Sequence, residues 1–129
     1  MKPLRTPVRL RAAGNVEKSI YEYIGRMSGE ESLSVARMES PAGWSEPGQR
    51  PAFREFTLVI SGAVRIETEA GVEIVRAGEA FICEPGEWVR YSTPEEPAEY
   101  VAVCTPAFSP EMVNRDEEAG PGAGPVRQP

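Results

Sequence analysis

Histidine is absent from this chain: none of its 129 residues carries an imidazole. Among the side chains, imidazole alone has an unperturbed pKa close to neutral, and it is the commonest metal ligand in proteins. Whatever chemistry the chain performs must therefore proceed without imidazole as a general base, a proton shuttle or a ligand. This absence is the most informative property of the composition.

Cysteine is also scarce, since only Cys83 and Cys104 occur. Both lie inside apolar stretches, and two such thiols are too few for a disulfide framework or a zinc site. We expect two buried free thiols. Cys104 would need an activating base to act as a nucleophile, so an inert thiol is the favoured interpretation.

Long apolar runs and runs of basic residues are missing as well. No stretch approaches the roughly 20 apolar residues of a membrane span, and residues 1–14 lack the apolar centre of a secretory signal. The net charge is −6, with 20 acidic against 14 basic residues, and no cluster of Lys or Arg could follow a phosphate backbone. We therefore expect a soluble cytoplasmic protein that binds neither membranes nor nucleic acid.

The length of the chain fits one domain, because a protein of this size buries roughly two thirds of its unfolded surface. We predict a single domain over residues 1–115. The final stretch AGPGAGPVRQP has no apolar pattern. Residues 116–129 are therefore predicted to form a flexible tail.

A period of two dominates the hydrophobic pattern, as in half-buried β-strands. Residues 63–76, AVRIETEAGVEIVR, form a predicted hairpin that turns at Glu69, Ala70 and Gly71. Gly and Pro separate the other segments. These further predicted strands are residues 19–26, 32–39, 54–61, 79–84, 88–93 and 98–104.

Helix signals are nearly absent. Residues 109–118, SPEMVNRDEE, are able to start one short helix, with Ser109 as the N-cap and Pro110 at the first helical position. Short strands divided by turns every eight to twelve residues are typical of a sandwich or a closed barrel. We predict an all-β fold, a small jelly roll.

Two motifs with glycines at fixed spacings, here called glycine frames, narrow the predicted fold further. In the first frame, Gly43 precedes Glu55, and six residues separate Glu55 from Gly62. The spacing on both sides of Glu55 is specific.

The second frame consists of Gly78-Glu79, a strand, Pro85-Gly86 and, three residues later, Val89. Together the two frames resemble the motifs of the cupins, in particular small single-domain cupins, over about residues 32–105. The resemblance implies a cupin jelly-roll barrel, also called a double-stranded β-helix, that holds a ligand or a metal in the mouth of the barrel.

The chain departs from the cupin pattern at the metal ligands, where the family carries histidine. The histidine positions fall on Gln49 and Pro51 in one register, on Gly48 and Arg50 in the other, and on Val89. Only Glu55 keeps a ligand's identity, and one carboxylate suits Fe, Ni, Cu or Zn poorly because these metals favour nitrogen or sulfur donors. We expect no metal cofactor. A site for Mg, Mn or Ca at Glu46, Gln49 and Glu55 stays open, although Ca²⁺ requires six or more oxygens.

Glu55 raises the question of what surrounds it. If its side chain points into the barrel, the strand period turns Thr57 and Val59 inward as well. The outward set is then Phe56, Leu58 and Ile60. A carboxylate in an apolar barrel mouth costs several kcal/mol unless it is paired or protonated. One interpretation makes Glu55 a ligand anchor or general base, with Arg50, Arg54 or Arg90 as candidates to pair with it or with an anionic substrate. The other makes it a remnant that is hydrogen-bonded to a barrel arginine or tyrosine.

The same alternation indicates further residues around the barrel mouth, while leaving open which strand faces line the interior. Tyr91 shares the face of Val89, and Tyr100 shares that of Cys104; both tyrosines are more often core residues than catalytic acids. Trp44 is either an aromatic platform at the rim or plain packing. The predicted ligand-binding residues are Glu46, Gln49, Arg50, Glu55, Thr57, Val89, Tyr91 and Tyr100.

Three functional interpretations follow. The first is a cupin without a histidine metal site that binds a small polar or carboxylated molecule. The second, which the resemblance permits, is a metal-independent isomerase, lyase or cyclase with Glu55 as the general base and Tyr91 or Tyr100 as the acid. The third is a regulatory or interaction module. Under all three we expect a homodimer, because many cupins pair through an outer sheet face and the set Phe56, Leu58 and Ile60 suits such a contact.

Overall fold

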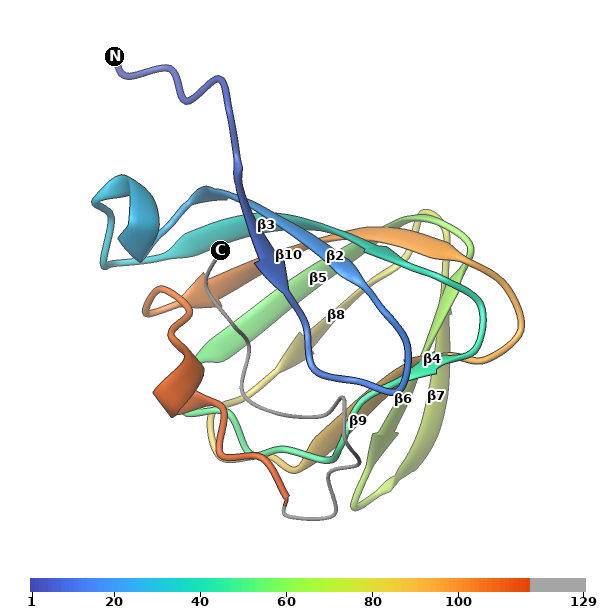
Figure 1. The fold of residues 1–129 in the computed structure, drawn as a ribbon. Helices are drawn as coiled ribbons and strands as arrows, with labels where there is room; N and C mark the ends of the chain where they lie inside the picture. Colours follow the sequence, from blue (N-terminus) through green and yellow to red (C-terminus); the bar gives the residue numbers. More distant parts are fainter. Residues whose placement is uncertain (117–129) are drawn as a thin grey trace.

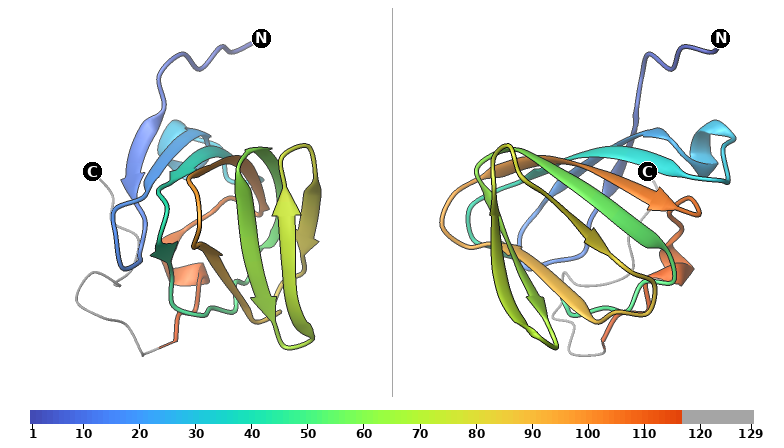
Figure 2. Two further views of the ribbon diagram at one scale, coloured as in Figure 1. Left: turned by 90° about the vertical axis from the view of Figure 1, so that its right-hand side faces the viewer. Right: turned by 180° about the vertical axis from the view of Figure 1, so that it is seen from behind.

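Two antiparallel β-sheets face each other and form an all-β jelly-roll barrel, as the strand pattern predicts (Figures 1 and 2). The computed structural model describes residues 1–116. The larger sheet contains, in spatial order, β1 (Val8–Arg11), β2 (Ser19–Ile24), β3 (Ser34–Ser40), β10 (Ala98–Thr105), β5 (Arg54–Ser61) and β8 (Ala80–Cys83). The smaller sheet contains β4 (Trp44–Ser45), β9 (Val89–Thr93), β6 (Ala63–Thr68) and β7 (Gly71–Arg76).

Every strand expected from the sequence forms, with ends that differ by at most two residues. The hairpin is confirmed, since β6 pairs with β7 and Thr68 lies opposite Gly71. β1 and β4 are additional. β4 has only two residues and β1 only one buried side chain, Leu10, so neither carries a readable alternation. Both form because β2 and β9 offer a paired edge.

The two helices within residues 1–116 are 3-10 turns of three residues each, η1 (Arg26–Ser28) and η2 (Pro110–Met112). No helix in this part of the chain is long and apolar enough to cross a membrane. The helix predicted from residue 109 is therefore a single turn, and Ser109 makes no side-chain cap hydrogen bond.

The residues that follow η2 run antiparallel to the segment after β4. The Arg50 N–H donates to the Asn114 carbonyl at 3.2 Å, and the Asp116 N–H donates to the Gly48 carbonyl at 2.8 Å. These bonds explain why the helix stops, because an extended partner already satisfies the backbone. Asp116 thus belongs to the folded domain, while the rest of the predicted tail, residues 117–129, lies outside the described residues.

β5 has the alternation predicted around Glu55. Glu55 and Thr57 are buried, whereas Leu58 is 46% and Ile60 is 48% exposed on the outer face. Phe56 is half-buried beside them. The homodimer expected through this face stays a prediction.

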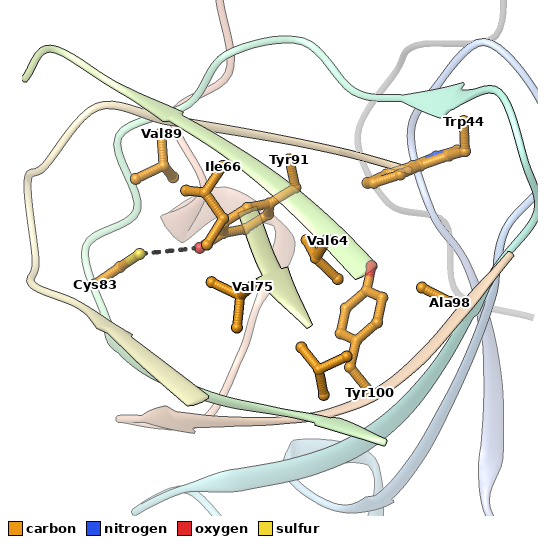
Figure 3. Close-up of a cluster of buried hydrophobic side chains, with 10 residues drawn as sticks. Trp44, Val64, Ile66, Val75, Cys83, Val89, Tyr91, Ala98 and Tyr100 are labelled. Carbon is orange, nitrogen blue, oxygen red and sulfur yellow. Dashed lines mark hydrogen bonds between the residues drawn. The ribbon is translucent and has the colours of Figure 1, made fainter. Parts of the chain in front are cut away.

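An apolar cluster fills part of the barrel between the sheets (Figure 3). Trp44 is its largest fully buried side chain. The members of the cluster are Trp44, Val59, Val64, Ile66, Val75, Cys83, Val89, Tyr91, Ala98 and Tyr100. A smaller cluster lies under the N-terminal strands and contains Leu10, Ile20 and Ala36. The two clusters border the cavity described below.

Gly62, the last glycine of the first frame, lies where the chain turns from β5 to β6. Its φ of +73° is in the left-handed region, and an added Cβ would lie 2.1 Å from the Pro97 carbonyl oxygen. Only glycine fits such a close approach. This explains in physical terms why the frame ends in glycine.

Candidate functional site

A cavity of about 70 Å³ lies inside the barrel, beside the apolar cluster. This volume exceeds the ~10–15 Å³ that one water requires, so the cavity has room for several waters or a compact ligand. Apolar side chains that line it include Leu10, Ile20, Phe53, Phe81 and Phe108. The charged and hydrogen-bonding side chains that line it include Lys18, Glu22, Glu46, Gln49, Glu55, Thr57, Tyr91, Tyr100 and Arg115.

Glu55 reaches the cavity from β5 and is 8% exposed. The Tyr91 hydroxyl donates to its Oε1 at 2.8 Å, and the Cys104 thiol lies 3.7 Å from its Oε2. Burial raises the pKa of Glu55, and the Tyr91 hydrogen bond opposes that rise. Glu55 is therefore a carboxyl group held in place by a phenol, on the edge of an open space.

The Tyr91 hydroxyl also lies 3.3 Å from the Cys83 sulfur (Figure 3). Burial is the main cause that raises the pKa of Tyr91 well above its usual value, followed by the charge of Glu55. Burial likewise raises the pKa of Cys83 to about 11 and raises that of Cys104. Both cysteines are free and buried, as expected, and both are protonated thiols at neutral pH.

Glu46 and Gln49 enter the cavity from the segment that follows β4. Glu46 is 9% exposed and Gln49 is 6% exposed. The side-chain atoms Oε2 of Glu46 and Oε1 of Gln49 are buried and find no hydrogen-bond partner among the described residues. Burial raises the pKa of Glu46 to about 7, against the opposing positive charges of Lys18 and Arg115.

Lys18 is the most unexpected residue of the site. It lies just before β2 and is only 5% exposed. Its ammonium nitrogen is 4.0 Å from the centre of the Trp44 ring and 5.0 Å from that of the Tyr100 ring. Among residues 1–116 no carboxylate lies within 4.0 Å of this nitrogen. Two aromatic faces thus hold a buried cation that has no ion-pair partner in this part of the chain.

The structure is similar to that of the polyketide cyclase RemF from Streptomyces resistomycificus. The TM-score is 0.74 and the sequence identity 18%, over 95% of this chain and 89% of that one. For an oxalate decarboxylase from Bacillus subtilis the TM-score is 0.69 and the identity 21%, over 85% of this chain and 30% of that one. The fold is that of the cupins. Likeness at this level of identity shows the fold alone.

No protein-family model matches the chain. Among curated proteins the chain is similar to the endoribonuclease YbeY of Myxococcus xanthus (strain DK1622), with 41% identity over 101 residues. The match covers 77% of this chain and 34% of that protein, so the chain spans about a third of the relative's length. Such a match does not carry the activity of the longer protein over to this chain.

Within the cupin barrel, six of the eight predicted ligand-binding residues line the cavity: Glu46, Gln49, Glu55, Thr57, Tyr91 and Tyr100. The other two do not. Arg50 points outward, where its Nη2 lies 3.5 Å from Glu69 Oε2. Val89 is fully buried in the apolar cluster. The placement of these two residues in the cavity is therefore wrong.

Of the two partners considered for Glu55, an arginine and a barrel tyrosine, the structure has the tyrosine. Arg54 pairs with Glu84 at 2.9 Å, and Arg90 lies 3.6 Å from Glu67. Both arginines have the outward parity of their strands, so strand geometry turns them away from the interior. Tyr91 supplies the hydrogen bond instead.

The two aromatic residues with open roles have clear positions. Trp44 is not a platform at the rim, because it is fully buried and its indole N–H donates to the Ala13 carbonyl at 3.2 Å. The Tyr100 hydroxyl is 2.9 Å from Ser40 Oγ, so it is satisfied while its ring borders the cavity.

Sequence reasoning missed Lys18, Glu22 and Arg115. Lys18 and Glu22 lie two residues before and two residues after Ile20, so strand alternation places these three side chains on one face. The inward side chain of Ile20 would have marked that face as the buried one. This signal is weak, because Lys18 precedes the predicted strand. Arg115 lies in the segment predicted to start a helix, and its position in the cavity depends on the pairing of residue 115 with Gln49.

The cupin metal positions have a poor donor set in this chain. Val89 offers no donor atom, and of the other positions only Gln49 and Glu55 line the cavity. Residues 1–116 contain no group of three or more acidic or cysteine side chains able to hold a metal. In addition, the Lys18 ammonium already places a positive charge near Glu46 and Glu55, which opposes the rise of their pKa values that burial causes. These residues do not fit a metal ion.

Proposed function

We propose that this chain is a metal-independent cupin that binds a small polar molecule in its barrel cavity. The observation that carries the proposal is the pair of orphaned acceptors, Glu46 Oε2 and Gln49 Oε1, both buried without a partner among the described residues. A buried polar atom without a hydrogen bond costs about 1–3 kcal/mol. A ligand that donates hydrogen bonds to these two atoms would offset this cost. The cavity therefore suits a ligand that carries hydrogen-bond donors.

Metal independence is supported by the donor chemistry. The cavity offers carboxyl and amide oxygens at Glu46, Gln49 and Glu55 but no imidazole, and it already contains the cation of Lys18. Transition metals favour nitrogen or sulfur ligands, and the thiols of this barrel are protonated. Ligand recognition would therefore depend on hydrogen bonds and on charge rather than on coordination.

The binding proposal is tested by thermal unfolding in the presence of a library of small polar and carboxylated compounds. A ligand at a hundred times its Kd stabilises the folded state by about 2.7 kcal/mol, which raises the Tm by roughly 10 °C. Ala102→Leu adds volume inside the cavity, whereas Ala80→Leu adds the same side chain at an exposed position of β8. We expect the shifts to disappear in Ala102→Leu and to persist in Ala80→Leu. A library without any hit on the wild type, or equal shifts in both variants, would contradict the proposal.

An acid–base enzyme is the second candidate function, and the contact between Glu55 and Tyr91 favours it. The phenol and the carboxyl are 2.8 Å apart at the border of the cavity, and burial raises the pKa of Glu55, which makes its carboxylate a stronger base. In an isomerase, lyase or cyclase reaction, Glu55 would remove a proton from the bound molecule. Tyr91 would hold the carboxylate in place and return a proton to a developing oxyanion.

This candidate predicts a kinetic result for any bound compound that is also converted. Glu55→Gln keeps the shape of the side chain but removes the base, so kcat should fall by about 10²–10⁴-fold while Kd changes little. Glu73→Gln makes the same change at an exposed position of β7, outside the cavity, and serves as the control. An unchanged kcat in Glu55→Gln would exclude Glu55 as the base.

We do not extend the proposal to RNA. The endoribonuclease named for Myxococcus xanthus is a protein of which this chain spans about a third. The net charge of −6 and the absence of histidine are unfavourable for binding and cleaving a phosphate backbone. A cavity of about 70 Å³ suits a compact molecule better than a polynucleotide.

A further inference from the structure

We infer that Lys18 anchors an anionic group of the ligand, so that the molecule bound in the cavity is a compact organic acid that also carries a hydrogen-bond donor. The inference rests on the proposed binding function and adds the chemical class of the ligand. It starts from a residue that no cupin motif includes and that lies ahead of both glycine frames.

The ammonium group of Lys18 has three N–H donors and no acceptor for ion pairing in residues 1–116. Its contacts are the faces of Trp44 and Tyr100, at 4.0 and 5.0 Å. Ring faces attract a cation, but they do not replace the hydrogen bonds that it loses on leaving water. A buried ammonium in this state requires an acceptor, and the cavity beside it is where one would bind.

The aromatic residues hold this cation in a defined place. The indole N–H of Trp44 is bonded to the Ala13 carbonyl, and the hydroxyl of Tyr100 is bonded to Ser40. Both rings are at most 4% exposed and form part of the apolar cluster. Lys18 is therefore positioned before any ligand arrives, and preorganised charges bind with a smaller loss of side-chain entropy.

An anion is favoured over a neutral acceptor because the nearby carboxyl groups leave the cation unpaired. Glu46 and Glu55 are close enough for Lys18 to lower their pKa values, yet neither comes within 4.0 Å of it. Burial favours the neutral form of both acids, which weakens them as counter-charges. A carboxylate from the ligand would make the charge-assisted hydrogen bonds that these two side chains do not make.

The rest of the cavity defines the rest of the ligand. Gln49 Oε1 is an acceptor without a donor, and the ionised form of Glu46 adds a second one at Oε2, so a ligand that also carries a hydroxyl or an amino group fits this end of the cavity. Between these polar ends the wall is apolar, with Ile20 and Phe81 among its side chains. A hydroxy acid with a compact apolar body satisfies all three requirements.

The test compares matched pairs of hydroxy acids and their neutral carboxamides, from glycolate and glycolamide to 4-hydroxybenzoate and 4-hydroxybenzamide, by titration calorimetry. We expect at least one acid to bind the wild type about tenfold or more tightly than its amide. Lys18→Met should abolish this preference. Lys2→Met changes the other lysine of the chain, which is exposed, and should preserve it. Lys18→Gln serves in place of Lys18→Met if the latter does not fold.

Equal binding of every acid and its amide by the wild type would overturn the inference, as would a preference that survives in both Lys18 variants or an absence of binding by every acid. If neutral compounds of the wider library still bind and Ala102→Leu still blocks them, the inference fails and the proposed binding function stands. If no compound of either set binds, both fail.

Discussion

Glu46→Gln is expected to remove a large part of the pH dependence of folding stability between pH 4.5 and pH 7. The pKa of Glu46 is about 7 in the folded chain against 4.5 in the unfolded one. The folded state therefore holds this proton more tightly. Its contribution to stability is fully present below pH 4.5 and is lost as the pH rises through 7, and the loss amounts to about 3 kcal/mol.

The measurement is urea unfolding at pH 5 and pH 8 for the wild type and two variants. The wild type should lose stability between these values, and Glu46→Gln should be the more stable protein at pH 8 because glutamine has no charge to bury. Glu73→Gln makes the same change on the exposed strand β7 and should follow the wild type. If the free energy of unfolding of the wild type and of Glu46→Gln changed equally between the two pH values, the pKa of Glu46 would be the same in the folded and the unfolded chain, and the prediction would be wrong.

Trp44→Ala is expected to cost about 3–5 kcal/mol of folding free energy, since it empties a fully buried site and breaks the hydrogen bond to Ala13. Trp44 joins the apolar cluster to the segment that carries Lys18. Trp44→Phe keeps a ring beneath the ammonium but lacks the indole N–H, so its cost should be clearly smaller. Chemical unfolding at one pH gives both values.

The other tryptophan provides the control. Trp88 is half-buried, and its indole N–H donates to Asp116 at 3.0 Å. Trp88→Ala should therefore cost less than Trp44→Ala. If the two alanine variants were equally stable, Trp44 would lie at an exposed rim instead of in the packed interior.

Several features of the fold could be read from local pattern. The alternation of β5 placed Glu55 and Thr57 on one face and Leu58 and Ile60 on the other, and burial agrees with this division at each position. The turn between β6 and β7 followed from the glycine of Glu69-Ala70-Gly71. These predictions succeed because the period of a strand is a property of the backbone alone.

The errors share a different origin. Val89 was placed in the cavity because of its position in the motif, yet a valine at that position packs into the apolar cluster. Arg50 was placed there because one register of the motif puts a histidine position on it, yet its side chain pairs with Glu69 outside the barrel. The position of a residue in the sequence indicates which part of the fold it belongs to. Local packing and charge decide in which direction its side chain points.

By itself, the amino-acid sequence determined that the chain is an all-β barrel, that Glu55 and Thr57 share one strand face opposite Leu58 and Ile60, and that no imidazole takes part in its chemistry. Only the tertiary structure decided that Lys18 lies between Trp44 and Tyr100, and that Glu46 and Gln49 face the same cavity without partners. The reason is that these residues come from segments far apart in sequence. Their meeting depends on the pairing and twist of two sheets, which a period of two residues does not encode.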